Sequence, residues 1–294
     1  MLKLSFSEIQ HKIRQSIDGL NVKLATLRAY SLGGLALNQL TSNKGYRKKS
    51  NIAYGLKARQ RLDLYYSDQQ GIKPLIVFVH GGAWSRGSKD DYKFLAESLT
   101  KAGYDIAIMN YHLAPEHIFP QYIQDLADAI QFLVKNEERL AISTSQIALL
   151  GHSAGAFNIM SLIYHPQLMN FSGLDRIKSL IGLAGPYHFD YLGDELAEPA
   201  FDTQISYQNV MPYYFVQKND IKHYLFLAED DQLVKDKNTF EFQRQLEKVG
   251  NHCEVFRIPR TGHVSIMASV ATLFSRFYKT RSVILKALEQ SFAK

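Results

Sequence analysis

Short apolar runs recur along the chain and alternate with longer segments whose apolar residues follow helical spacing. The apolar runs predict β-strands at residues 61–66, 74–80, 104–110, 146–150, 177–184, 223–227 and 252–258. The central runs are apolar throughout, which is typical of strands covered on both faces of a sheet. The segments between them predict helices at residues 90–102, 119–140, 156–163 and 234–249 and beyond 264. This alternation predicts an α/β fold with a largely parallel sheet, whose chemistry gathers at the carboxyl ends of the strands.

Residues 1–45 follow a different pattern, a stripe of apolar residues at near-helical spacing with basic residues interleaved. They predict a helical N-terminal arm, and the charged residues 47–51 predict an exposed linker after it. Two interpretations of the arm stay open. It is either a helix packed on the domain with a solvated basic face, or an amphipathic surface helix that contacts a membrane or covers the active site.

Composition and charge narrow the class of protein. A hydrophobic content of 46% and a charged content of 21% are ordinary for a globular protein. The single cysteine, Cys253, excludes a disulfide within one chain. No run approaches a membrane span, and charged residues interrupt the first apolar stretch, so we expect a cytoplasmic protein without a signal peptide.

The positive charge is concentrated at one end of the chain. The whole chain carries a net charge of +6. Residues 1–61 hold 12 Lys and Arg against two acids, a net charge of +10, which leaves −4 for the rest. A mildly acidic body argues against nucleic-acid binding. The basic arm instead suggests peripheral membrane contact through residues 1–50.

The segment 151–155 has the sequence Gly-His-Ser-Ala-Gly and lies between a predicted strand and a predicted helix. Strand, Gly-x-Ser-x-Gly and helix form the context of a nucleophile elbow. A side chain at Gly151 or Gly155 would collide with the neighbouring strand and helix. The turn makes Ser153 a candidate nucleophile, although the five letters alone are a weak signal.

Other candidate residues also follow strands. The segment 80–84, His-Gly-Gly-Ala-Trp, matches an oxyanion loop of the H-G-G type, whose backbone amides would stabilise negative charge. His80 is expected to brace this loop, and Trp84 to line the substrate pocket. After the strand at 223–227 come three acids, of which Asp231 is the predicted triad acid and Asp230 the alternative. His263 follows the last strand, so the order Ser153, Asp231, His263 is that of an α/β hydrolase.

In these motifs the chain resembles the α/β-hydrolase superfamily, specifically the H-G-G carboxylesterases related to hormone-sensitive-lipase-like and kynurenine-formamidase-like enzymes. The segments 61–66, 110–116 and 119–129 add to the resemblance, which covers roughly residues 54–280. It implies an α/β-hydrolase fold: a mostly parallel sheet of about eight strands with helices on both faces and a short cap insertion. We therefore expect a helical arm at 1–50 and a catalytic domain at 51–294, with the cap-like insertion at 186–222. Three departures are His112, where relatives often carry Arg, Ala83, where many carry a third Gly, and residues 1–45, which match no part of the family pattern.

The resemblance implies cleavage of a small-molecule ester through an acyl-enzyme, with no metal or organic cofactor. It places oxyanion amides at Gly82, Ala83 and Ala154. Residues 187–215 are rich in aromatic residues, so Tyr187 and its neighbours either form an apolar substrate pocket or the core of the insertion. A small or medium apolar or aromatic ester is the expected substrate. The alternatives are an arylformamidase and a non-catalytic binding module on a hydrolase scaffold.

Overall fold

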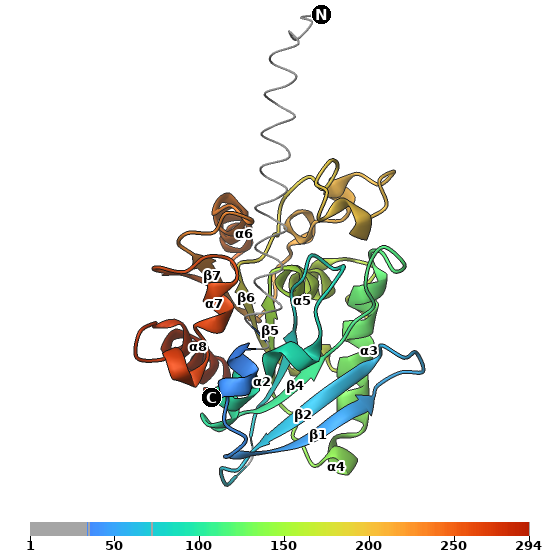
Figure 1. Cartoon of the computed structure of the whole chain (residues 1–294). Helices are drawn as coiled ribbons and strands as arrows, with labels where there is room; N and C mark the ends of the chain where they lie inside the picture. Colours follow the sequence, from blue (N-terminus) through green and yellow to red (C-terminus); the bar gives the residue numbers. More distant parts are fainter. Residues whose placement is uncertain (1–33, 35, 72, 294) are drawn as a thin grey trace, which may run out of the picture.

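A computed structural model describes residues 34, 36–71 and 73–293 of the chain (Figure 1). Its centre is an eight-stranded sheet in the order β1-β2-β4-β3-β5-β6-β7-β8. The strands are β1 (Tyr46–Ala53), β2 (Arg61–Ser67), β3 (Leu75–Val79), β4 (Asp105–Met109), β5 (Ile147–His152), β6 (Ile177–Leu183), β7 (Lys222–Ala228) and β8 (Cys253–Ile258). The main helices are α2 (Lys93–Thr100), α3 (Gln121–Lys135), α4 (Glu137–Leu140), α5 (Ala154–Tyr164), α6 (Lys237–Lys248), α7 (Ser265–Ala268) and α8 (Thr280–Phe292). The predicted α/β-hydrolase architecture, with about eight strands, is confirmed.

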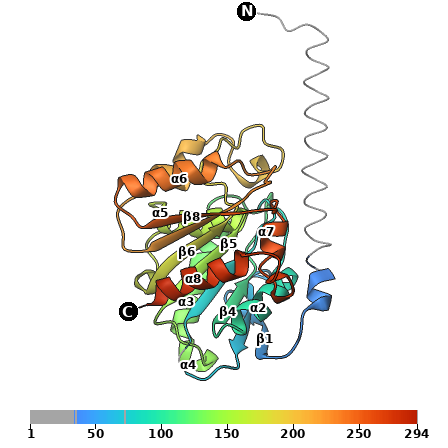
Figure 2. The same ribbon diagram turned by 90° about the vertical axis from the view of Figure 1, so that its left-hand side faces the viewer.

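The sheet separates two hydrophobic cores. Strands β3 to β8 run parallel, while β2 is antiparallel to both β1 and β4. In β3 successive side chains alternate between the cores: Leu75, Val77 and Val79 pack on one face, and Ile76 and Phe78 on the other. The first core includes apolar residues of α3, α5 and α6, and the second those of α2, α7 and α8 (Figure 2). Helices on both faces explain why the central strands are apolar throughout.

The first strand corrects one expectation. Residues 47–51, predicted to be a linker, lie in β1, which pairs antiparallel with β2. The expected boundary between residues 50 and 51 therefore falls inside a strand of the sheet. Residues 1–33 and 35 of the predicted helical arm lie outside the described residues, and residues 36–40 are helical.

The predicted insertion at 186–222 connects β6 to β7 and contains the short 3-10 helices η3 (Glu198–Ala200), η4 (Tyr207–Asn209) and η5 (Pro212–Phe215). It lies beyond the carboxyl ends of β5 and β6, where Figure 1 draws it in yellow and gold. Among the described helices, none is long and apolar enough to cross a membrane.

Candidate active site

The turn between β5 and α5 holds Ser153 in a backbone conformation that few residues adopt. Its φ is 52° and its ψ is −121°, and its N–H donates to the Leu183 carbonyl at 2.9 Å. A Cβ at Gly155 would lie 2.0 Å from the Val79 oxygen, and one at Gly151 would lie 2.4 Å from the Gly155 oxygen. The predicted need for glycine at both positions is confirmed. The turn lets β5 pass directly into α5 with the serine at its apex.

Ser153, His263 and Asp231 form a continuous chain of hydrogen bonds. The His263 Nε2 atom lies 2.8 Å from the Ser153 Oγ, and its Nδ1 atom lies 2.8 Å from the Asp231 Oδ2. The side chains of His263 and Asp231 are almost completely buried. These three groups come from the ends of β5, β7 and β8, so the sheet brings together residues more than a hundred positions apart.

The Asp231 carboxylate is held in its charged form. Burial alone would raise its pKa, but hydrogen bonds from His263 and from the amides of Val234 and Leu233 outweigh burial, so the pKa lies below its ordinary value. Both amides donate to Oδ1 at 2.9 Å, which leaves Oδ2 for the histidine. An ionised acceptor at this position favours the tautomer in which Nδ1 carries the proton.

The two neighbouring acids lie apart from the histidine. Asp230 is exposed, and its backbone N–H donates to the Thr261 carbonyl at 2.8 Å. Glu229 is also exposed, and its carboxylate accepts from the Arg260 amide at 3.0 Å. Of the three acids considered from the sequence, Asp231 is thus the one within hydrogen-bond distance of His263.

The loop after β3 turns its backbone toward the elbow. Gly82 has a φ of +120°, and Ala83 and Trp84 also have positive φ. A Cβ at Gly82 would lie 2.4 Å from the Arg86 oxygen, so this position requires glycine on two grounds. Among hydrogen bonds between described residues, the amides of Gly82, Ala83 and Ala154 have no acceptor. They are free to donate to a bound oxygen.

Buried polar contacts brace this loop from behind. The Tyr111 hydroxyl donates to the His80 carbonyl at 3.0 Å, and the two rings stack with centroids 4.3 Å apart. Arg59 donates to the carbonyls of Tyr111 and Gly87 and so ties the two loops together. Burial lowers the pKa of His80 to about 3, so its ring is neutral. This placement agrees with a bracing role for His80. His112 pairs with the Asp125 carboxylate at 2.7 Å in the adjoining loop.

His152 contacts the backbone of His263, which sequence reasoning missed. Its Nε2 atom lies 2.8 Å from the backbone oxygen of His263, and it is completely buried. Burial lowers its pKa to about 3, so the ring is neutral and its N–H can donate to that carbonyl. No local pattern marks this residue, because its partner lies 111 positions away.

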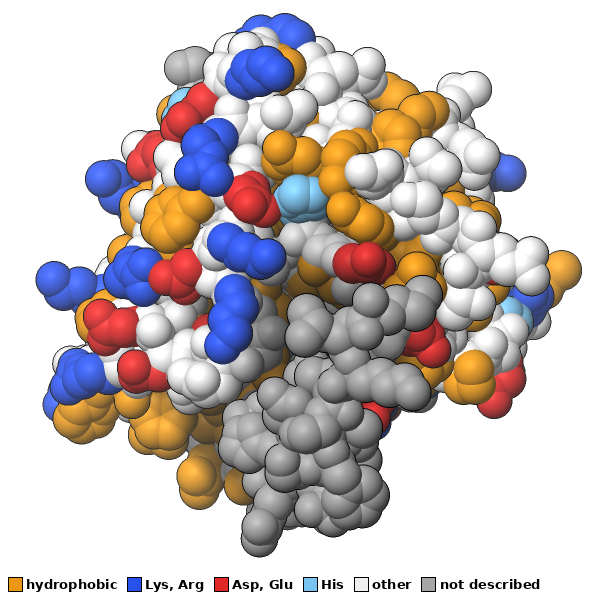
Figure 3. Space-filling view, turned by 90° about the horizontal axis from the view of Figure 1, so that it is seen from above, with side chains coloured by type: hydrophobic (Ala, Val, Ile, Leu, Met, Phe, Trp, Pro, Cys, Tyr) orange, Lys and Arg blue, Asp and Glu red, His pale blue; other side chains and the backbone are white. Residues whose placement is uncertain are grey.

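A cavity of about 240 Å³ opens beside Ser153 and His263. Apolar side chains make much of its wall: Trp84, Pro186, Phe189, Leu196, Leu233 and Val234. Asp190, Lys235 and Lys237 add exposed charges at its rim. From above, hydrophobic side chains border a histidine on this end of the molecule, with acidic and basic side chains around them (Figure 3).

Trp84 and Tyr187 differ in their relation to this cavity. Trp84 lines it, and its indole N–H donates to the Asn158 Oδ1 at 2.9 Å, which fixes the ring. Tyr187 is fully buried elsewhere, stacked on Phe242 with centroids 4.8 Å apart. Of the two alternatives left open by the sequence for Tyr187, the structure therefore favours the core of the insertion over the wall of this cavity. The insertion contributes Phe189 to the cavity, and much of its other aromatic surface to the core.

The fold is that of the α/β hydrolases, and Ser153, His263 and Asp231 are arranged as a Ser-His-Asp triad is. Residues 62–165 match the sequence model of the BD-FAE family. The isoprenylcysteine alpha-carbonyl methylesterase of Arabidopsis thaliana is 31% identical over 153 residues, which cover 50% of this chain and 36% of that protein. The chain thus matches little more than a third of the length of this relative. The kynurenine formamidase of Drosophila melanogaster is 25% identical over 243 residues, covering 79% of this chain and 80% of that enzyme.

Solved structures agree on the fold. A bacterial heroin esterase superposes with a TM-score of 0.71 at 20% identity, and the match covers 91% of this chain and 92% of the heroin esterase chain. An inhibited esterase B from Lactobacillus rhamnosis gives a TM-score of 0.72 at 17% identity, covering 91% of this chain and 95% of its own. The chain is similar to these esterases in the arrangement of its strands and helices.

Proposed function

We propose that the chain is a serine hydrolase that cleaves carboxylic esters through an acyl-enzyme. The observation that carries this proposal is the buried hydrogen-bond chain from Ser153 through His263 to Asp231 at the elbow. His263 accepts the Ser153 proton as the serine oxygen attacks the ester carbonyl carbon. The alcohol then leaves with a proton from His263, and water releases the acid by the reverse route.

Asp231 and the backbone amides supply the charge stabilisation. Asp231 keeps His263 in the reactive tautomer and stabilises its cation. The amides of Gly82, Ala83 and Ala154 are proposed to hold the oxyanion, because they have no acceptor among the described residues. Each such donor stabilises the transition state by about 3 kcal/mol.

The cavity favours small or medium substrates with an apolar or aromatic group. Its volume of about 240 Å³ is modest, and Trp84 and Phe189 lie on its wall. A flat apolar group gains contact with these rings by burying surface from water. A long-chain triglyceride would need far more space than this cavity offers.

Arylformamidase activity is the second candidate, because kynurenine formamidases are among the relatives that match most of the chain. A panel of p-nitrophenyl esters of graded acyl length, a prenylcysteine methyl ester and N-formylkynurenine separates the possibilities. The ester proposal expects the highest kcat/KM on a short or medium ester. A clear preference for the formamide would replace it with the second candidate.

The test of the mechanism uses Ser153→Ala with Ser145→Ala as a control, since Ser145 is an exposed serine outside the site. Ser153→Ala is expected to lose ester turnover and labelling by a fluorophosphonate probe, and the control to keep both. If the native chain is not labelled, it is instead a binding module on a hydrolase scaffold.

We also propose a cytoplasmic location with peripheral membrane contact through residues 1–50. The support is the net charge of +10 in residues 1–61 and the apolar stripe of the arm. Because β1 begins at Tyr46, the truncation that tests this contact removes only residues 1–33. Equal co-sedimentation of both forms with anionic vesicles would refute it.

A further inference from the structure

A second cavity is more apolar than the first, and its described lining does not include Ser153, Asp231 or His263. It has a volume of about 300 Å³ and lies between the helical residues 36–40, the start of α2 and α7. Its wall consists almost entirely of apolar surface and includes Leu37, Leu40, Phe94, Met267, Ala268 and Phe274. Nothing in the proposed ester cleavage uses this cavity. Apolar cavities of this kind hold apolar ligands in preference to water.

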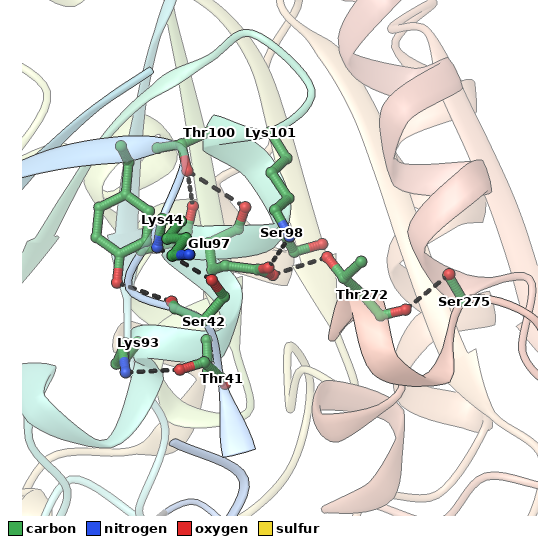
Figure 4. Close-up of polar contacts among 12 residues, drawn as sticks. Thr41, Ser42, Lys44, Lys93, Glu97, Ser98, Thr100, Lys101, Thr272 and Ser275 are labelled. Carbon is green, nitrogen blue, oxygen red and sulfur yellow. Dashed lines mark hydrogen bonds and ion pairs between the residues drawn. The ribbon is translucent and has the colours of Figure 1, made fainter. Parts of the chain in front are cut away.

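Polar contacts hold the walls of this cavity in place. The Lys93 ammonium donates to the Thr41 carbonyl at 2.8 Å, and the Asn38 side chain accepts from the Phe94 amide at 3.1 Å. On the opposite wall, the Thr272 hydroxyl donates to the Glu97 carboxylate at 2.7 Å. Figure 4 shows the Lys93 contact with Thr41 and the Glu97 contact with Thr272, which tie these two residues to α2. These hydrogen bonds therefore fix the position of the cavity walls relative to α2.

The mouth of the cavity is apolar as well. Leu40 lines the cavity although 73% of its surface is exposed, so it marks the opening. Leu273, which precedes the lining residue Phe274, is 56% exposed. Large apolar side chains exposed beside an apolar cavity are typical of a surface that is covered in use.

The sequence before the cavity indicates what covers it. Apolar residues at helical spacing in the arm include Leu27 and Tyr30, and Leu37 and Leu40 follow them at intervals of seven and three residues. Leu37 and Leu40, which line the cavity, therefore belong to the same apolar pattern as the arm, in the part of the sequence where the positive charge is concentrated. Clustered positive charge beside apolar surface suits the anionic surface of a lipid bilayer.

We propose that this cavity binds one acyl chain of an anionic membrane phospholipid. The headgroup stays outside the cavity, and the acyl chain enters past Leu40 between α2 and α7. This binding is independent of ester cleavage and depends on the proposed membrane contact only as the source of the lipid. It would hold the enzyme at the bilayer by burying apolar surface as well as by charge.

The test uses the full chain and vesicles of phosphatidylcholine and phosphatidylserine that contain a phosphatidylserine with a photoreactive diazirine in one acyl chain. After irradiation, mass spectrometry locates the cross-links. We expect them in peptides that contain residues 36–40 and 264–274, which line the cavity. Leu40→Asp places a charge at the mouth and should lower their yield about tenfold or more. Ala268→Trp should do the same by filling the cavity without changing any charge.

Leu56→Asp is the matched control, since Leu56 is a fully exposed leucine that lines a different groove. Normal cross-linking in this control, with normal hydrolysis of a soluble ester by Leu40→Asp, supports the proposal. Equal yields in Leu40→Asp and Leu56→Asp would overturn it. Cross-links at the cavity only after removal of residues 1–33 would also overturn it, because the occupant would then be the chain's own N-terminal segment. Absence of ester hydrolysis by the native chain would count against the proposed function and leave the cross-linking result standing.

Discussion

Replacing Asp231 by Asn tests the proposed mechanism with almost no change in shape. In the native site, Oδ1 of Asp231 accepts the amides of Leu233 and Val234, both at 2.9 Å, and Oδ2 faces the His263 Nδ1 at 2.8 Å. The asparagine oxygen should keep the two backbone amides, because the amide NH₂ group cannot accept from them. The NH₂ group then points at His263.

The consequence is a wrong tautomer. An NH₂ donor facing Nδ1 makes that nitrogen an acceptor, so the proton moves to Nε2, where it blocks transfer from Ser153. The loss expected for such a change in a Ser-His-Asp triad is about 10⁴-fold in kcat, which corresponds to about 5.5 kcal/mol. The fold should persist because both backbone hydrogen bonds remain.

The assay is kcat and KM on a short p-nitrophenyl ester, with circular dichroism and a melting curve for each variant. Asp230→Asn is the matched control, since Asp230 is exposed and its backbone, not its carboxylate, bonds Thr261. We expect Asp230→Asn to stay within about twofold of the native kcat. A larger loss in Asp230→Asn than in Asp231→Asn, or equal losses, would refute the assigned role of Asp231.

Three further predictions address residues around the site. His152→Ala removes the hydrogen-bond partner of the His263 carbonyl, which lies 2.8 Å from the His152 Nε2. We expect kcat to fall about tenfold at similar KM and to be partly restored in His152→Gln. If His152→Gln restores nothing, His152 only fills space. Gly155→Ala should lower the free energy of unfolding in urea by about 3 kcal/mol or more, because its Cβ would lie 2.0 Å from the Val79 oxygen. Gly193→Ala, at a position with open space and a φ of +74°, should lower it by only about 1 kcal/mol. Similar losses in the two variants would contradict the steric argument. Burial raises the pKa of the Cys253 thiol to about 12, so iodoacetamide at pH about 8 should label the native chain far more slowly than the urea-unfolded chain; equally fast labelling would count against this pKa.

Much of the fold could be predicted from the chain alone, because its evidence is local. The strands β3 and β5 are continuous apolar runs, and such runs are typical of strands buried on both faces. The Gly-x-Ser-x-Gly pattern is complete within five residues, and Gly151 is required by a contact within the turn itself, although the contact that requires Gly155 involves Val79 of β3. The strand-helix alternation then orders the elements and places Ser153, Asp231 and His263 at the same edge of the sheet.

The first strand shows where local evidence ends. Its burial pattern is almost wholly exposed, and the run Arg47, Lys48, Lys49 has the composition of a linker. In the structure the Lys48 ammonium pairs with Asp63 at 2.7 Å, and Arg47 lies over the Tyr66 ring. Such charged edge strands are common because they discourage pairing with other molecules. Their identity comes from a neighbouring strand rather than from their own hydrophobic pattern.

The amino-acid sequence by itself determined the class of fold, the elbow and the order of the candidate triad, since each depends on spacing along a strand, a turn or a helix. Tertiary structure alone placed Asp231 rather than Asp230 beside His263, turned Tyr187 into the core, and brought His152 against the His263 carbonyl. It also closed residues 36–40 over α2 and α7 to form the second cavity. The physical reason is the same in each case. Which way a side chain faces depends on partners that are distant in the chain, and only packing decides which partners meet.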